Sequence, residues 1–394
     1  MNTKLVLVNG KAFTTSGVVN DAVVVVRGAK IEEISSSKGF APENGWQVVD
    51  VRGGLICPGF IDIHLNGGGG ALVMDGTLDS ICKIARAHAS FGTTAMLPTT
   101  VAWGEDAQNK AIGGILEAMQ KGTGGAKPLG VHMEGPFLNP QKAGAHNPKY
   151  LLEPSIPAFD RFHSAAKGTL KIMTLSPELP HSEELIRYAS AKGVIVSAGH
   201  TMASYGQAVD SIRAGVHLCA HLFNAMPTIS AREPGLALAA LTSPEMFVEL
   251  ITDGVHVHPA LINLTIRTKG TSGVLIVTDA TPPSGTHQKT WQLEGETVII
   301  KGYTGYLEDG TIAGSALTMG QALKVTSELT KLPLADLLPM TSLNQARLLG
   351  ISAQKGSLEV GKDADIVVLS NDGNLDVQLT MVEGVVVFSQ LSQG

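Results

Sequence analysis

Cysteine, aromatic residues and charge are all scarce in this chain of 394 residues. The three cysteines, Cys57, Cys82 and Cys219, stand far apart, which excludes a disulfide framework and a CxxC motif and indicates a reducing compartment. Lysine and arginine number 29 against 35 aspartates and glutamates, so the formal net charge of −6 gives no overall field that attracts nucleic acid or anionic lipid. An anionic substrate would have to be held by a few local cations.

Long hydrophobic runs are missing as well. No stretch approaches the roughly 18 apolar residues of a membrane span. The first residues, MNTKLVLVNGKAF, lack the basic region, apolar core and cleavage site of a signal peptide. The sequence therefore predicts a cytoplasmic, soluble protein, and its 44% hydrophobic and 16% charged residues are typical of a well-buried globular enzyme.

Short apolar, β-rich runs recur through the middle of the chain, and most are separated by amphipathic stretches of helical length. Strands of this kind alternating with helices indicate a parallel sheet covered by helices, and eight of them predict an α/β fold of the (β/α)8 TIM-like barrel type. A doubly wound open sheet is the alternative, but no GxGxxG turn follows the first strand. The eight runs are LICPGFIDIH, TTAMLPTT, PLGVHMEGPF, LKIMTLSPE, GVIVSAGH, HLCAHLFNA, MFVELITDGVH and GVLIVTDA.

The two ends of the chain differ from its middle. Residues 1–56 and 354–394 contain β-branched runs separated by Gly, Asn and Asp, which predicts one small β-sandwich domain built from both termini. The barrel is then expected over residues 57–353. A β-hairpin insertion is expected near residues 282–314, after the eighth strand.

Polar residues stand at the C-terminal ends of the predicted strands, the end where barrels of this type build their active sites. A cap or a loop contact explains one such residue. Several of them in the ligand-type set Glu, His, His and Asp favour a metal-centred site instead. The residues at these strand ends are His64, Glu134, His200, His221, His256 and Asp279.

One Glu and two His form the ligand set of a catalytic zinc, which keeps one position open for water. Glu134 lies in the apolar run HMEGPF, where an unpaired carboxylate is costly to bury, and His200 and His221 end later strands. We expect these three residues to bind one divalent metal per chain, Zn²⁺ or else Fe²⁺. A hydrogen-bonded core histidine is the alternative for His200, and His132 and His217 are expected to be structural.

Asp279 ends the eighth strand in the run VTDATPP. An Asx-turn before the two prolines is its structural alternative. A divalent metal lowers the pKa of water in its open position from about 15.7 toward about 7. A carboxylate that is not a ligand could accept that water's proton and pass it to a leaving group. This combination predicts metal-assisted hydrolysis of an amide or ester.

Motifs along almost the whole chain resemble, in order, those of the N-acetylglucosamine-6-phosphate deacetylase family of the amidohydrolase superfamily. HMEGPF together with HLFNAMP is specific to that family, whereas PGFID and VTDA mark only the superfamily. The resemblance implies removal of acetate from N-acetyl-D-glucosamine 6-phosphate in amino sugar catabolism, with Glu134, His200 and His221 on the metal and Asp279 as general acid and base. The motifs are PGFIDIHLNGGGG, GVHMEGPFLNP, AGAHNP, SAGHT, AHLFNAMP, REPG, DGVHVHP, VTDAT and DGTIAGS.

The resemblance implies further roles. His146 would polarise the acetyl carbonyl. Arg232 would reach the phosphate in the neighbouring subunit's site, which implies a homodimer, although a surface salt bridge with Glu233 is the alternative for this arginine. The other predicted substrate-binding residues are Asn224, Ala225, His256 and His64.

The first barrel strand bears on the number of metals. Family members with two histidines there can hold a second metal, and this chain has Asn66 in the second place. It therefore resembles the single-metal kind, although His64 leaves a second site open. Three other functions remain: an N-acetylgalactosamine-6-phosphate deacetylase, another N-acyl amidohydrolase, and a non-catalytic scaffold, which the presence of the ligands and of Asp279 disfavours.

Overall fold

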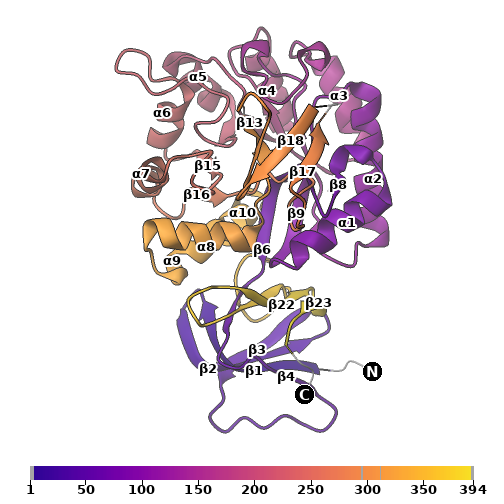
Figure 1. Ribbon diagram of the computed structural model, residues 1–394, viewed down its shortest axis with the longest axis vertical. Helices are drawn as coiled ribbons and strands as arrows, with labels where there is room; N and C mark the ends of the chain where they lie inside the picture. The colour runs from indigo at the N-terminus through magenta and orange to yellow at the C-terminus, as the bar shows by residue number, and fades with distance from the viewer. Residues whose placement is uncertain (1–3, 294–295, 311, 392–394) are drawn as a thin grey trace.

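A computed structural model describes residues 4–293, 296–310 and 312–391, and its larger part is a barrel of eight parallel strands (Figure 1). Each strand pairs in parallel with the next. A parallel bridge from Leu65 to Ala280 brings the end of the barrel back beside its first strand, so the barrel is nearly closed and the predicted fold is confirmed. The strands are β6 (Phe60–Leu65), β9 (Thr93–Thr100), β11 (Val131–Glu134), β12 (Leu170–Leu175), β13 (Ile195–Ala198), β14 (Val216–Cys219), β15 (Phe247–Leu250) and β16 (Val274–Ile276).

Amphipathic helices cover the outside of this barrel. In α1 (Leu78–Ala89), Ile81, Ile84 and Ala85 recur at helical spacing and are buried, and the Thr77 side chain caps the helix by accepting a hydrogen bond from the Ser80 backbone N–H. The helices that follow are α2 (Glu105–Lys121), α3 (Ile156–Ala165), α4 (Ser182–Ala191), α5 (Tyr205–Ala214), α6 (Gly235–Thr242), α7 (Pro259–Lys269), α8 (Met319–Thr330), α9 (Leu334–Thr341) and α10 (Leu343–Leu348). No helix among the described residues is long and apolar enough to cross a membrane.

Both ends of the chain form one mixed sheet with its own hydrophobic core, below the barrel in Figure 1. Its strand order is β23-β22-β21-β5-β1-β2-β3, and β4 pairs with β1. The buried Lys355 links this sheet internally through Asp365 (2.6 Å) and Glu383 (3.1 Å). The strands are β1 (Lys4–Thr14), β2 (Gly17–Arg27), β3 (Lys30–Ser36), β4 (Gln47–Asp50), β5 (Leu55–Pro58), β21 (Ile366–Leu369), β22 (Val377–Val382) and β23 (Val385–Ser389).

The run expected to be the first barrel strand is divided between the two sheets. β5 belongs to the mixed sheet and β6 to the barrel, and Gly59 separates them. A Cβ atom at Gly59 would lie 2.2 Å from Cγ2 of Thr94, so only glycine fits this crossing.

A small antiparallel sheet follows the eighth barrel strand, where the sequence indicated a single hairpin. Its four strands lie in the order β17-β18-β19-β20. A bridge between Ser315 and Ala280 joins β20 to the end of the barrel, so this insertion lies at the barrel mouth. The strands are β17 (Thr290–Leu293), β18 (Glu296–Lys301), β19 (Thr304–Tyr306) and β20 (Ile312–Ser315), and the remaining short elements are β7 (Gly67–Gly68), β8 (Ala71–Leu72), β10 (Lys127–Pro128) and the 3-10 helices η1 (Val73–Asp75), η2 (Pro140–Lys142) and η3 (Pro148–Tyr150).

Candidate active site at the C-terminal ends of the barrel strands

A pocket of about 400 Å³ opens where the barrel strands end. It collects residues that are far apart in the sequence, as expected for the C-terminal face of a barrel. His64 lies beneath this surface and is fully buried, and Arg232 is exposed outside the pocket. The predicted site residues that line the pocket are Glu134, His146, His200, His221, Asn224, Ala225, His256 and Asp279.

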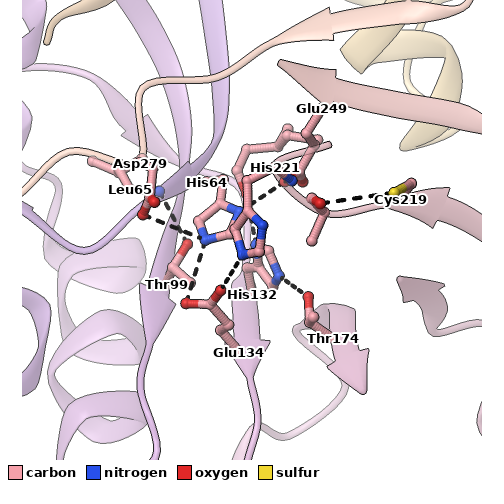
Figure 2. Close-up of polar contacts among 12 residues, drawn as sticks. His64, Leu65, Thr99, His132, Glu134, Thr174, Cys219, His221, Glu249 and Asp279 are labelled. Atoms are coloured by element: carbon pink, nitrogen blue, oxygen red, sulfur yellow. Dashed lines mark hydrogen bonds and ion pairs between the residues drawn. The ribbon is translucent and has the colours of Figure 1, made fainter. Parts of the chain in front are cut away.

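Glu134, at the end of β11, is the centre of the site. Its Oε1 atom lies 3.1 Å from Nε2 of His200 and 3.0 Å from Nε2 of His221, and these two nitrogens are 3.1 Å apart. Its Oε2 atom faces Nε2 of His64 at 3.4 Å and Nε2 of His146 at 3.5 Å. Figure 2 shows Glu134, His64, His221 and Asp279 directed toward one another. One carboxylate and two imidazole nitrogens therefore converge as a ligand set would.

The hydrogen bonds of His200 fit metal ligation. Its Nδ1–H donates to the carbonyl oxygen of Lys142 at 2.8 Å, which leaves the lone pair of Nε2 directed at Glu134 and His221. Ligand histidines commonly donate their second ring N–H in this way. Burial lowers the pKa of His200, which favours the neutral ring that a metal requires.

Electrostatics also keep Glu134 ionised. Burial alone would raise the pKa of its carboxyl, but the charge of His64 and hydrogen bonds from neighbouring histidines bring that pKa well below its usual value. The pKa of His221 is raised, because its contact with Glu134 outweighs the effect of burial. A metal at this site would therefore compete with a proton on His221 and bind less well in acid.

Three of the strand-end residues adopt left-handed backbone conformations, with φ of 48° at His200, 26° at His221 and 48° at Asp279. Such values are uncommon for residues other than glycine and cost on the order of 1–3 kcal/mol each. At each of these three residues, the backbone thus leaves the strand direction in the same way as the side chain reaches the pocket.

Asp279 has an oxygen held in place and a partly open side chain. The side-chain amide of Asn66 donates to its Oδ1 atom at 2.8 Å, and Nε2 of His64 lies 3.7 Å from the same oxygen. The Asp279 side chain is 20% exposed, whereas that of Glu134 is 5% exposed. Among the described residues, the carboxylate bonds to Asn66 rather than to the turn that follows it. This geometry suits a carboxylate that exchanges protons with a bound substrate.

Two further histidines have their nitrogens fixed by neighbours. The Ala102 backbone N–H donates to Nδ1 of His146 at 3.3 Å, which leaves Nε2 as the N–H donor of a neutral ring facing the site. Nδ1 of His256 bonds to Asp253 at 2.7 Å, and Asp253 also accepts a hydrogen bond from Thr304 of β19 at 2.8 Å. The insertion at the barrel mouth thereby supports His256.

Arg232 projects from a loop of the barrel mouth and is exposed. Glu233, its alternative partner, instead accepts a hydrogen bond from the Tyr205 backbone N–H at 2.7 Å. No ion pair of Arg232 is found in the part of the chain that the structure describes. Within the described residues, its guanidinium is therefore not held by an ion pair.

His132 is structural, as expected from the sequence, because Nδ1 bonds to the Ile63 carbonyl at 2.9 Å and Nε2 to Thr174 Oγ1 at 2.8 Å. His132 belongs to a second group of possible metal ligands, together with His64 and Glu249. With both of its nitrogens already bonded, that group has only two donors left. The other possible group combines Glu134, His146 and His200.

Two polar residues of the site were missed in the sequence. The sequence pattern gives Asn66 only as the residue in place of a second histidine, and it includes Glu249 in the apolar run MFVELI. Glu249 is fully buried in β15, where its Oε2 atom accepts hydrogen bonds from Nδ1 of His64 (2.8 Å) and from the backbone N–H of His221 (3.1 Å). A lone carboxylate in so apolar a strand was the available signal.

The barrel mouth holds one carboxylate and several imidazoles arranged as metal ligands, with a second carboxylate beside them. This arrangement is typical of the metal-dependent barrel hydrolases. Residues 55–387 match the amidohydrolase family. The chain is 34% identical to the N-acetylglucosamine-6-phosphate deacetylase of Bacillus subtilis, over 95% of each chain. It is 36% identical to the N-acetylgalactosamine-6-phosphate deacetylase of Escherichia coli O157:H7, over 84% of this chain and 87% of the relative.

Solved structures agree. The N-acetylglucosamine-6-phosphate deacetylase of Pasteurella multocida superposes with a TM-score of 0.91 at 32% identity, over 97% of this chain and 99% of its own. A mutant of the Mycobacterium smegmatis enzyme in complex with N-acetyl-D-glucosamine-6-phosphate has a TM-score of 0.89 at 28% identity, over 98% and 100% of the two chains. The chain belongs to the amidohydrolase family and, within it, to the N-acetylglucosamine-6-phosphate deacetylases.

Proposed function

We propose that this protein hydrolyses the acetamido group of N-acetyl-D-glucosamine 6-phosphate to acetate and D-glucosamine 6-phosphate. The observation that carries the proposal is the convergence of Glu134, His200 and His221 within about 3 Å of one another in the same pocket as Asp279. Family membership over nearly the full chain supports this choice of reaction.

Glu134, His200 and His221 would hold one divalent metal per chain, and the ligand set suits Zn²⁺ first and Fe²⁺ second. When bound, the metal would supply Lewis acidity for water activation and amide polarisation. The tautomer of His200 and the ionised state of Glu134 support this assignment. His64 would remain a neighbour of the site rather than a ligand of a second metal, because Asn66 donates its amide to Asp279.

The chain's own groups would carry the protons. Asp279 would accept a proton from the attacking water and deliver it to the amine nitrogen, which is a poor leaving group unless protonated. His146, with Nε2 as its donor, would hydrogen-bond to the acetyl oxygen as negative charge develops there. Asn224, Ala225 and His256 would bind the sugar phosphate from within the pocket.

Arg232 would complete phosphate binding in the neighbouring subunit of a homodimer. Its exposure outside its own pocket supports this role, and guanidinium is well suited to phosphate. A cytoplasmic location stays a prediction. The three cysteines are free and buried.

Steady-state kinetics on the 6-phosphates of N-acetylglucosamine and N-acetylgalactosamine test the proposal. We expect acetate release with a higher kcat/KM for the gluco substrate, and much weaker activity on unphosphorylated N-acetylglucosamine. N-acetylgalactosamine 6-phosphate is the second candidate, because one relative named for that substrate is 36% identical to this chain. A preference for it would reverse the assignment, and no acetate release from either compound would refute deacetylation.

A further inference from the structure

Glu249 is a fully buried carboxylate in β15. It is neither one of the proposed metal ligands nor one of the groups proposed to carry protons in the reaction. Burying a carboxylate without partners costs several kcal/mol, so its place near the barrel axis requires a compensating interaction. Burial alone would raise the pKa of Glu249, but its contacts with His64 lower that pKa, and the group is therefore held as an anion.

A single oxygen of Glu249 contacts two different parts of the site. Oε2 accepts the Nδ1–H of His64 at 2.8 Å and the backbone N–H of His221 at 3.1 Å (Figure 2). With Nδ1 fixed, the His64 ring can present only Nε2 to the pocket side. That atom lies 3.4 Å from Oε2 of Glu134 and 3.7 Å from Oδ1 of Asp279.

We propose that Glu249 is a positioning residue for the deacetylation proposed above, and that it acts through His64. It holds the imidazole so that Nε2 faces Glu134 and Asp279, which both line the pocket where the attacking water would give its proton to Asp279. A water bonded to both Asp279 and His64 has its orientation restricted, and its free lone pair is then directed at the acetyl carbon. Among the described residues, Nε2 of His64 makes no hydrogen bond, and its contact with Glu134 at 3.4 Å is an ion-pair contact.

A metal shared by His64, His132 and Glu249 is a poorer explanation of this cluster. Both nitrogens of His132 are engaged, by the Ile63 carbonyl and the Thr174 hydroxyl. Two remaining donors fall short of the three or four protein ligands usual for a bound transition metal. The hydrogen bond from Glu249 to His64 is instead the arrangement that orients an imidazole.

The test compares Glu249→Leu and Glu249→Gln with the wild type and with His64→Ala. Glutamine keeps an oxygen that can accept both hydrogen bonds, whereas leucine keeps only the approximate volume. We expect E249L to lower kcat by about 10- to 100-fold, with KM within about 2-fold and the metal content unchanged, and E249Q to stay within about 5-fold of the wild type. Equal losses in E249Q and E249L would overturn the hydrogen-bonding role.

The double variant E249L/H64A separates positioning from general support of the fold. If Glu249 acts through His64, then adding E249L to H64A should change kcat by less than about 2-fold, which is the signature of coupled residues. A full further loss, or loss of metal in E249L alone, would overturn the proposal. Glu249→Ala provides a second truncation, subject to the same criteria, in case E249L does not fold.

Asp365→Asn is the matched control. Asp365 is another buried carboxylate, bonded to Lys355 in the mixed sheet and absent from the pocket lining. The variant Asp365→Asn should lower the denaturation midpoint and leave kcat unchanged. A wild type without deacetylase activity would refute the proposed function itself, whereas an active wild type with a fully active E249L would refute only the role of Glu249.

Discussion

Asn66 Nδ2 donates a 2.8 Å hydrogen bond to Oδ1 of Asp279, so the loop after the first barrel strand fixes the carboxylate that ends the last one. The second oxygen of Asp279 is left for proton transfer. A second metal at this place would need a ligand where the amide N–H of Asn66 now points. Asn66 thus affects both the position of the proposed base, Asp279, and the number of metals that the site can hold.

Asn66→Ala should therefore reduce turnover rather than binding. Loss of one positioning hydrogen bond, worth about 0.5–1.5 kcal/mol, should lower kcat by about 3- to 10-fold and leave KM nearly unchanged. Asn139→Ala is the control, because it removes an amide that donates to Glu178 rather than to Asp279. A rise in KM at constant kcat would place Asn66 in substrate binding instead.

Asp279→Asn tests the base itself. General acid–base catalysis contributes typically 10²- to 10⁴-fold, so kcat should fall by about that factor. Asparagine keeps the shape and tolerates the left-handed backbone at φ 48°, so the fold and metal content should survive. Near-normal kcat in a fully metallated variant would show that Asp279 is structural.

The metal set predicts about one tightly bound divalent ion per chain, measured by elemental analysis without added metal. His221→Ala should lose most of it, because the variant keeps only two of the three proposed ligands. His217→Ala is a control from the same segment, since His217 is exposed in β14. Two equivalents in the wild type, with His64 bound to the second, would contradict the single-metal site.

Arg232→Ala should weaken substrate binding. Charge-assisted hydrogen bonds contribute about 1.5–3 kcal/mol, so KM for the 6-phosphate should rise about tenfold or more. Activity on unphosphorylated N-acetylglucosamine should barely change. Arg213→Ala, which removes an exposed arginine paired with Asp210, is the matched control. Lower kcat with an intact KM would remove Arg232 from the phosphate site.

The barrel could be predicted because its strands are apolar throughout and separated by helical periodicity, as in TTAMLPTT, which matches β9 residue for residue. The polar residues at the strand ends could be predicted equally well, since Glu134 and Asp279 interrupt apolar runs. These signals depend on spacing along the chain alone.

Other features depend on contacts between distant segments. The division of the first run at Gly59 follows from its close approach to Thr94, and the bond between Asn66 and Asp279 spans 213 residues. Glu249 has the same character, because its partners are His64 in β6 and His221 in the turn after β14. A single sequence shows that such a carboxylate is unusual, but it does not show what the carboxylate contacts.

Asp62 should make stability depend on pH in a direction unusual for an aspartate. Burial raises its pKa to about 7, against an ordinary value near 4, although hydrogen bonds from Thr278 and the His64 backbone oppose that rise. Below about pH 4 the group is protonated in both the folded and unfolded states. Between about pH 4 and 7 the unfolded chain releases the proton and the folded chain keeps it, so stability falls as pH rises, and above pH 7 the loss is constant. A difference of about 3 pKa units corresponds to at most about 4 kcal/mol.

Asp62→Asn should remove this contribution, because its amide can still accept from the backbone N–H groups and can donate to the Thr278 hydroxyl. The urea midpoint of the variant relative to the wild type should therefore rise between pH 4 and 7 and then level off. Thr278→Val, which removes the hydroxyl that donates to Asp62, should act in the opposite direction at pH 8, where the ionised carboxylate loses a donor. A midpoint difference that stays constant from pH 4 to 8 would show that Asp62 titrates alike in the folded and unfolded chain.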